Sequence, residues 1–261
     1  MLEPLQYVLG AISGGLVGFV LGLVGGGGSI LAVPLLLYLV GIRNPHEAIG
    51  TSALAVAANA LAGLWNHAHA HTVNWRCGGM YAAAGVVGAL GGSTLGKSID
   101  GHKLLFLFAL LMIVVAALMF RGRGDQGIDG AQCDRGNATK VLGYGFGTGA
   151  FSGFFGIGGG FLIVPGLIAS THMPILRAIG TSLVAVAAFG LTTALNYALS
   201  GYVLWGLAGV FIAGGIIGSM AGTRASQALA RQKGQLNNLF AVFVFLVAVY
   251  MLFKSWAALS S

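Results

Sequence analysis

The sequence predicts an all-α polytopic membrane protein with two inverted-topology repeats of five apolar segments each, the second segment of each repeat being short and broken or re-entrant. Three observations lead to this fold class: the composition, a series of apolar segments and an internal repeat. Of 261 residues, 57% are hydrophobic and only 7% are charged, whereas roughly a quarter of a soluble domain is charged. So few charges argue against a soluble enzyme, a disordered chain and a nucleic-acid-binding module. The net charge of +7 is therefore expected to face anionic lipid.

Ten apolar segments follow one another, separated by charges, glycine clusters and prolines. They are residues 5–24, 29–42, 48–65, 78–96, 104–120, 140–155, 160–170, 178–199, 203–224 and 236–256. Eight of them are long enough to cross the hydrocarbon layer, which takes about 20 residues. The second and the seventh reach only about 15–20 Å. Each of these two follows a glycine cluster, so we expect both to be broken or re-entrant helices that end inside the membrane.

An internal repeat divides the chain. The sequence Ala-Ile-Gly-Thr-Ser at 48–52 recurs at 178–182, an offset of 130. Further matches follow in the same order: Gly27-Gly28 with Gly158-Gly159, Val33-Pro34 with Val164-Pro165, Val73 and Trp75 with Val203 and Trp205, Gly88 and Gly92 with Gly218 and Gly222. A colinear series of this kind predicts a duplicated unit. The first transmembrane repeat is expected at 1–120, a polar cytoplasmic linker at 121–138 and the second repeat at 139–261.

The odd number of segments in each repeat predicts that the second repeat enters the membrane in the opposite orientation. With the N-terminus outside, nine Lys and Arg residues fall in inside loops and four fall outside, as the positive-inside rule requires. Joining each short segment to its predecessor as one span distributes the basic residues six against seven, which favours neither orientation. Periplasmic N- and C-termini are therefore expected. A re-entrant hairpin and two full spans give the same parity, so both remain open.

Inverted repeats with short, glycine-broken helices at matching positions point to the substrate site of a secondary transporter. A helix that begins inside the bilayer leaves N–H groups unpaired, and these groups favour an anion. The predicted substrate-binding residues are the two glycine clusters, the hydroxyl groups of the repeated pentapeptide and one arginine: Gly25, Gly26, Gly27, Gly28, Ser29, Thr51, Ser52, Gly156, Gly158, Gly159, Gly160, Thr181, Ser182 and Arg177.

Each of these assignments has a structural alternative. Glycines also allow close helix packing, and Ser or Thr hydroxyls also bond the preceding helical turn. Arg177 could attract an anion and Glu47, at the equivalent position, could carry a proton, but interfacial loop charges are the simpler interpretation of both. Asn59, Asn66 and Asn196 are interpreted as polar contacts between packed helices.

The acidic residues favour an anion as the substrate. All six lie in termini, loops or segment boundaries: Glu3, Glu47, Asp100, Asp125, Asp129 and Asp134. A buried cation site or a carboxylate proton relay therefore has little to be built from. For the same reason no catalytic residue, cofactor or metal is expected, and the protein is not expected to be an enzyme.

At this point the sequence resembles a known family. The stretches 25–34 and 156–165, each followed by Ala-Ile-Gly-Thr-Ser, resemble the motifs of the TauE/SafE sulfite exporter family, also called the toluenesulfonate uptake permease family. The resemblance covers nearly the whole chain, including the duplication. It implies a bacterial inner-membrane transporter of sulfite or small organosulfur anions.

We expect this transporter to work by alternating access coupled to protons. Its expected partners are a small sulfur-containing anion and membrane lipid, with no nucleic acid, and a monomer and a homodimer both remain open. Two other functions also remain open: a passive anion channel of the same architecture, and a divalent-metal transporter that uses His67, His69 and His71. The last of these rests on the spacing of His67 and His71, which places both on one face of a helix as in zinc sites, although a solvated interfacial cluster is the simpler interpretation.

Two further features are expected to carry no function. Residues 91–98 fit the phosphate-binding pattern G-x-x-x-x-G-K-[ST], but they close an apolar run and no suitable Asp follows, so nucleotide binding is not expected. Cys77 and Cys133 have no partner spacing and are expected to be free thiols without a structural role, with a single bridge as the alternative.

Overall fold

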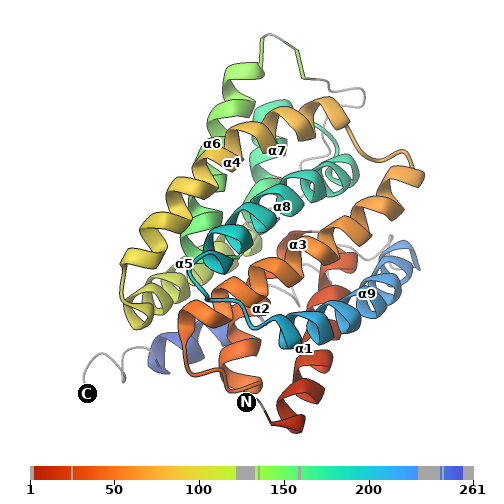
Figure 1. The fold of residues 1–261 in the computed structure, drawn as a ribbon. Helices are drawn as coiled ribbons and strands as arrows, with labels where there is room; N and C mark the ends of the chain where they lie inside the picture. The colour runs from red at the N-terminus through yellow and green to blue at the C-terminus, as the bar shows by residue number, and fades with distance from the viewer. Residues whose placement is uncertain are drawn as a thin grey trace.

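The structure is a computed structural model that describes residues 3–24, 26–121, 133–134, 136–157, 160–228, 242 and 244–254. The described residues contain no β-strand and are almost entirely helical (Figure 1), which confirms the all-α class. The helices are α1 Pro4–Val24, η1 Gly26–Leu31, α2 Ala32–Pro34, η2 Leu35–Leu39, α3 Pro45–His69, α4 Trp75–Ser98, α5 Gly101–Arg121, α6 Ala138–Phe155, α7 Gly160–Thr171, α8 Ile175–Ala198, α9 Trp205–Ala228 and a last helix at Val244–Lys254. Where they are described, they coincide with the predicted apolar segments to within a few residues.

Local capping explains where several helices begin and end. The side chain of Asn44 accepts the His46 N–H at 3.0 Å before α3, and the side chain of Asn74 accepts the Cys77 N–H at 3.1 Å before α4. Asn is among the preferred residues at this position because its side chain satisfies a helix N–H that has no partner within the helix. At the end of α6, Gly156 has φ +67° and the Ile157 N–H bonds the Ser152 carbonyl at 3.2 Å. This left-handed termination needs glycine and ends α6 inside the molecule.

Two short helical runs follow longer helices and turn back on them. Residues 26–39 form one run of 3₁₀ (η1), α (α2) and π (η2) turns. This run returns to the end of the molecule where α1 begins, since Gln6 Nε2 donates to the Val40 carbonyl at 3.1 Å. In the second half, α7 turns back along α6 in the same way and has 12 residues, about 18 Å. The second and seventh segments are therefore short, as expected.

Backbone contacts through glycine join the helices in pairs. Helix α1 lies parallel to α9, and α4 lies parallel to α6 (Figure 1). A Cβ atom on Gly18 of α1 would collide with the backbone of Gly215 in α9, and one on Gly88 of α4 would collide with the Phe146 carbonyl of α6. Packing this close is typical of membrane helices, where small residues let backbones approach. Many of the glycines therefore serve packing.

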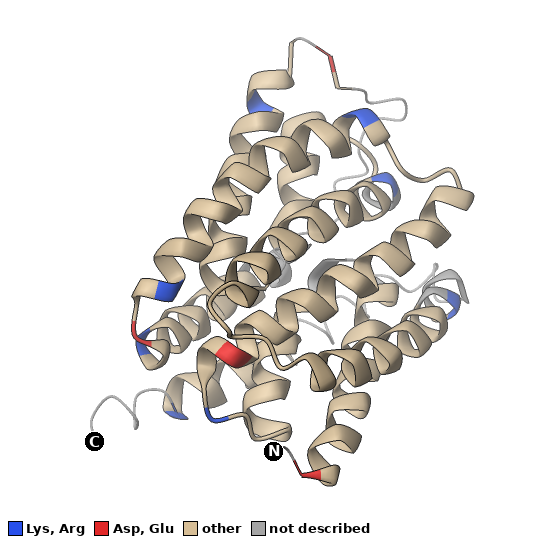
Figure 2. Cartoon of the chain, viewed as in Figure 1, with Lys and Arg blue, Asp and Glu red and all other residues tan. Residues whose placement is uncertain are grey.

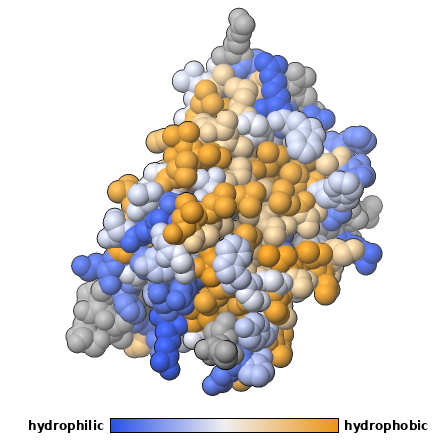
Figure 3. All heavy atoms as spheres, viewed as in Figure 1, coloured by the Kyte–Doolittle hydropathy of each residue, from blue (hydrophilic) through white to orange (hydrophobic). Residues whose placement is uncertain are grey.

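Helices α3 and α8 pack side by side in opposite directions in the centre of the molecule (Figure 1). In the most apolar stretch of α3 and of α8, 67% of the residues are buried, against 33% in α1 and in α9. Within the part of the chain that the structure describes, four helices are long and apolar enough to cross a membrane: Pro4–Leu23, Pro45–His69, Arg177–Ala198 and Trp205–Gly222. The described charged residues lie toward the two ends of the molecule (Figure 2), and apolar side chains cover the middle of the face in Figure 3. These features are those of a polytopic membrane protein.

The two cysteines form a disulfide bond, so the expectation of free thiols was wrong. Cys77 lies in the first turn of α4 and bonds to Cys133, 56 positions along the chain, just before α6. Both residues are buried. The parallel packing of α4 and α6 brings the two helix starts together. Sequence spacing alone does not reveal this packing.

Leucine substitutions on α4 test the glycine packing. Gly88→Leu places a side chain against the backbone of α6, whereas Gly79→Leu points into open space. We expect Gly88→Leu to lower stability by about 1–3 kcal/mol or more, because overpacking forces backbone shifts. The measurement is thermal unfolding of the purified proteins in one detergent. Equal melting temperatures for the two variants would contradict the packing of α4 on α6.

Candidate functional site

The two short runs meet inside the molecule. The first turns of residues 26–39, in η1, pack against α7 and α8 as well as α1. Ser29, Ile30 and Leu31 are fully or almost fully buried. On the other side, Gly156 at the end of α6 contacts Ile49 of α3. The chain therefore starts a helical run within the protein interior, where N–H groups need a partner other than lipid.

The predicted glycines fall into three groups. Gly25, Gly158 and Gly159 lie outside the described residues. Gly26 and Gly27 belong to η1, and Gly160 is the first residue of α7. Gly28 and Gly156 have packing roles, because a Cβ on Gly28 would lie 2.5 Å from the Leu21 nitrogen and one on Gly156 would collide with Ile49. At these two positions glycine is needed for the chain to turn and pack.

Thr51 and Thr181 make matching contacts with opposite halves of the chain. The hydroxyl oxygen of Thr51 accepts the Leu204 N–H at 3.0 Å, and that of Thr181 accepts the Asn74 N–H at 2.9 Å. Leu204 and Asn74 directly precede α9 and α4. Both threonines are buried with no measurable exposure. Each therefore satisfies a backbone N–H where a helix of the other half begins.

The neighbouring serines bond within their own helices. Ser52 donates to the Ile49 carbonyl at 2.9 Å and Ser182 donates to the Ile179 carbonyl at 2.7 Å. These are the bonds to the preceding helical turn that the sequence left as an alternative. Arg177 lies near the start of α8 with an exposed side chain. The four hydroxyl groups thus all contact protein, and the arginine lies apart from them at the surface.

Asn59 has a more unusual environment than the sequence suggested. It lies midway along α3 with no exposed surface, and neither atom of its amide has a partner among the described residues. A Cβ on Gly215 of α9 would collide with this amide. Leaving a buried polar group unpaired costs about 1–3 kcal/mol, so the amide is suited to a water or a ligand. The sequence signal was a lone polar residue in an apolar run, which by itself is equally typical of helix packing.

The remaining polar motifs bind protein groups. Lys97 donates to the Asn196 side chain at 2.7 Å, to the Asn196 carbonyl at 2.9 Å and to Ser200 at 2.9 Å. Asn196 in turn donates to Ser93 and Thr94. The polar residues of the phosphate-binding pattern therefore connect α4 to the end of α8, and Asn196 has the helix-packing role expected of it.

The histidines lie at the end of α3 and beyond it. His67 Nδ1 is 2.8 Å from the Thr72 hydroxyl, and His69 Nδ1 is 2.8 Å from the Trp65 carbonyl. His71 is exposed and has φ +53°. Among the described residues, no group of three or more His, Cys, Asp or Glu side chains is placed to hold a metal ion.

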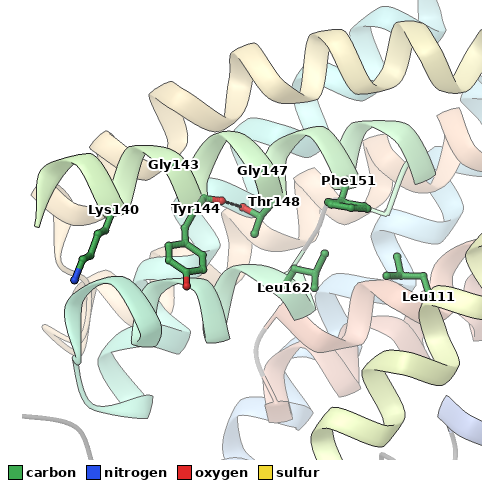
Figure 4. A pocket seen from close by; sticks show the side chains of 8 residues that line it. All are labelled: Leu111, Lys140, Gly143, Tyr144, Gly147, Thr148, Phe151 and Leu162. Carbon is green, nitrogen blue, oxygen red and sulfur yellow. Dashed lines mark hydrogen bonds between the residues drawn. The ribbon is translucent and has the colours of Figure 1, made fainter.

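Two hollows are lined by described residues. One, of about 820 Å³, lies at the end of the molecule where α1 starts, with Gln6, Arg43, Glu47 and the first turn of α9 in its wall. The other, of about 550 Å³, is an apolar groove along α6 that also contacts α5 and α7 (Figure 4). Lys140 lies at one end of this groove and Phe151 lies toward the other.

The fold and the buried half-helices define a polytopic membrane protein with polar groups enclosed in its interior. The chain belongs to the TauE/SafE sulfite exporter family, because the family model "Sulfite exporter TauE/SafE" matches residues 10–251. A probable membrane transporter protein of Xylella fastidiosa strain 9a5c is 52% identical over 253 residues, covering 95% of each chain. The probable membrane transporter protein YunE of Bacillus subtilis is 26% identical, covering 84% of this chain and 88% of its own. No solved structure matches the chain.

Substitutions of Thr51 test the contact between the halves. Thr51→Val keeps the shape of the side chain but leaves the Leu204 N–H without its acceptor, so we expect a loss of about 1–3 kcal/mol in stability. Thr51→Ser keeps the hydroxyl group and should retain most of the stability. Thr192→Val is the matched control, because the Thr192 hydroxyl bonds the Ala188 carbonyl of its own helix. If Thr51→Val and Thr192→Val melt at the same temperature, the inter-half bond has no energetic role.

Proposed function

We propose that this protein is a secondary transporter that carries sulfite or a small organosulfur anion across the bacterial inner membrane by alternating access, coupled to protons. The observation that carries the proposal is the contact of η1 with α7 in the protein interior. Two short helical runs start there from opposite halves of the chain, each after a glycine cluster. Membership of the sulfite exporter family supports a sulfur oxyanion as the substrate class.

The halves are proposed to be inverted repeats. The pair Thr51–Leu204 and the pair Thr181–Asn74 are related by the 130-residue offset. At the starts of the halves, the Glu3 N–H bonds the Gln6 side chain and the Asp134 N–H bonds the Asn137 side chain, with an offset of 131. The helix pairs α1–α9 and α6–α4 correspond in the same way. A twofold axis between α3 and α8 would relate all of these contacts. In transporters built from inverted repeats, the substrate site lies at the repeat interface.

The anion is proposed to bind to backbone N–H groups at the starts of the short runs. Gly25–Ser29 supply these groups from one half and Gly158–Gly160 supply them from the other, whereas the Gly156 N–H donates to the Gly153 carbonyl at 3.3 Å. Aligned peptide dipoles favour negative charge at a helix start, and hydrocarbon offers these N–H groups no water. Thr51 and Thr181 then support the site by fixing the starts of α9 and α4, whereas Ser52 and Ser182 bond within their own helices. Asn59, with its buried and unpartnered amide, is a further polar group for a solute or water in the interior.

The linker end is proposed to face the cytoplasm, with both termini in the periplasm. Arg76, Lys140 and Arg177 lie near the starts of α4, α6 and α8, close to the linker, and the acidic Asp134 lies there too. Both basic and acidic positions occur near the end with the N-terminus (Figure 2). Basic residues concentrate on the cytoplasmic side of membrane proteins. On this orientation Arg177 helps to attract the anion on the cytoplasmic side, near the start of α8.

Valine substitutions in the glycine clusters test the anion site. Gly27→Val and Gly159→Val should abolish sulfite flux in proteoliposomes and leave membrane insertion intact, because a side chain blocks approach to the N–H groups. Gly91→Val on the open face of α4 is the control. Gly28 is unsuitable for this test because its Cβ would collide with α1. Flux that is unchanged in both cluster variants would overturn the backbone anion site.

A pH gradient separates the coupled transporter from a passive anion channel. Proteoliposomes loaded with sulfite should show faster flux when a proton gradient is imposed, because coupled proton movement then drives the anion. The same vesicles with a protonophore are the control. A flux that follows the sulfite gradient alone would identify a channel, and parallel vesicles with sulfate and taurine would define the anion class.

A further inference from the structure

The disulfide bond lies at the basic end of the molecule. Cys77 is in the first turn of α4, next to Arg76, and Cys133 precedes the start of α6. The Asp134 carboxylate accepts the N–H groups of Gly136 and Asn137 at 3.0 and 3.1 Å, so the chain beside Cys133 is a capped helix start. The bridge therefore joins two ordered helix ends.

The equivalent pair of helix starts in the other half borders a hollow. Leu207 occupies the position of Cys77 in the second repeat, and Glu3 occupies that of Asp134 in the first. Both Leu207 and Glu3 line the hollow of about 820 Å³ at the end with the N-terminus. The same two helix starts thus border a hollow at one end of the molecule and are joined by a covalent bond at the other.

The bridge is also connected to the inter-half contact of Thr181. The Asn74 side chain accepts the Cys77 N–H at 3.1 Å, and the Asn74 N–H donates to the Thr181 hydroxyl at 2.9 Å. One residue therefore connects the half-cystine to the central helix α8. A shift of the α4 start would alter the contact between the halves.

The position of the bridge conflicts with a permanent structural disulfide. The proposed orientation places this basic end in the cytoplasm, where glutathione and thioredoxin keep thiols reduced. We propose that Cys77 and Cys133 form a reversible redox site that reacts with glutathione-type disulfides and that, when oxidised, fixes the starts of α4 and α6 to each other and slows transport. The effect on transport and the cytoplasmic location rest on the proposed function, whereas the reactivity of the pair does not.

Oxidation of the two cysteines by oxidised glutathione is a thiol–disulfide exchange in two steps. One cysteine thiolate attacks a sulfur of oxidised glutathione, forming a mixed disulfide and releasing one glutathione thiolate. The second cysteine thiolate attacks the protein sulfur of that mixed disulfide and releases the second glutathione. Two protein thiols become one disulfide, one oxidised glutathione becomes two reduced ones, and the two thiol protons end on glutathione. In the bridged state both cysteines are buried, so exchange with glutathione requires a movement of the α4 start that exposes a sulfur.

The first experiment traps the thiols in intact cells. Rapid acidification and alkylation, followed by mass spectrometry of the full chain, should find both cysteines reduced in unstressed cells and bridged after treatment with a thiol oxidant. A bond already present in unstressed cells would overturn the reversible site and favour a periplasmic linker. Failure to form the bond after oxidation would overturn it as well. This readout does not depend on the substrate.

The second experiment measures sulfite flux of the purified protein in proteoliposomes equilibrated with reduced or oxidised glutathione. We expect oxidation to lower flux on the order of tenfold, within the range of allosteric coupling. Cys133→Ser and, independently, Cys77→Ala should transport at the reduced rate in both buffers. Equal flux of the wild type in both states would overturn the effect on transport. If no state transports sulfite, the proposed function fails, and the trapping experiment still decides whether the redox site exists.

Discussion

The structure depends on one constraint: each backbone N–H inside the apolar region must find a partner, because hydrocarbon supplies none. Within long helices the ladder of bonds meets this need. At helix starts it is met by specific side chains, as Asn74 does for Cys77 and Thr51 does for Leu204. The proposed anion site lies at the starts of the two short runs in the interior, where the same need arises. An anion that takes the place of water there would be bound by the backbone itself, so the proposed site follows from the same constraint that shapes the fold.

Glycine contributes both to helix packing and to the starts of the short runs. In lipid the hydrophobic effect contributes little to helix association, so close backbone packing stabilises the contacts between helices. The contact of Gly18 with Gly215 and that of Gly88 with Phe146 supply such packing. At the tip of the first hairpin, Gly28 packs against α1 while its neighbours Gly26 and Gly27 begin the short run. Packing and anion binding are therefore not competing explanations for a glycine cluster. The close turn that packing permits also places the backbone of η1 in the interior.

Hydropathy and the repeat were enough to predict the helical class, the positions of the segments and the shortness of the second and seventh. These features depend on residues that are near one another in the chain. The partners of the site residues were not predictable in the same way. The bond from Leu204 to Thr51 spans 153 positions, and the bridge from Cys133 to Cys77 exists because α4 and α6 pack in parallel. Asn59 illustrates the same limit, since only its three-dimensional surroundings distinguish an unpaired amide from a packing contact.

Equivalent positions of the two halves agree near the centre of the molecule and differ toward its ends. Their central contacts match, as the threonine bonds demonstrate. Toward the ends, equivalent positions carry different chemistry: Glu47 in the first half corresponds to Arg177 in the second, and His67, bonded to Thr72, corresponds to Tyr197, whose ring lies 6.3 Å from that of Tyr202. In the proposed inverted repeat, a symmetric centre would allow the same site to open toward either side at similar free energy. Because the cytoplasm and periplasm differ in proton activity, redox state and lipid charge, divergence is expected at the two ends. The disulfide bond at one end and the hollow at the other agree with this proposal.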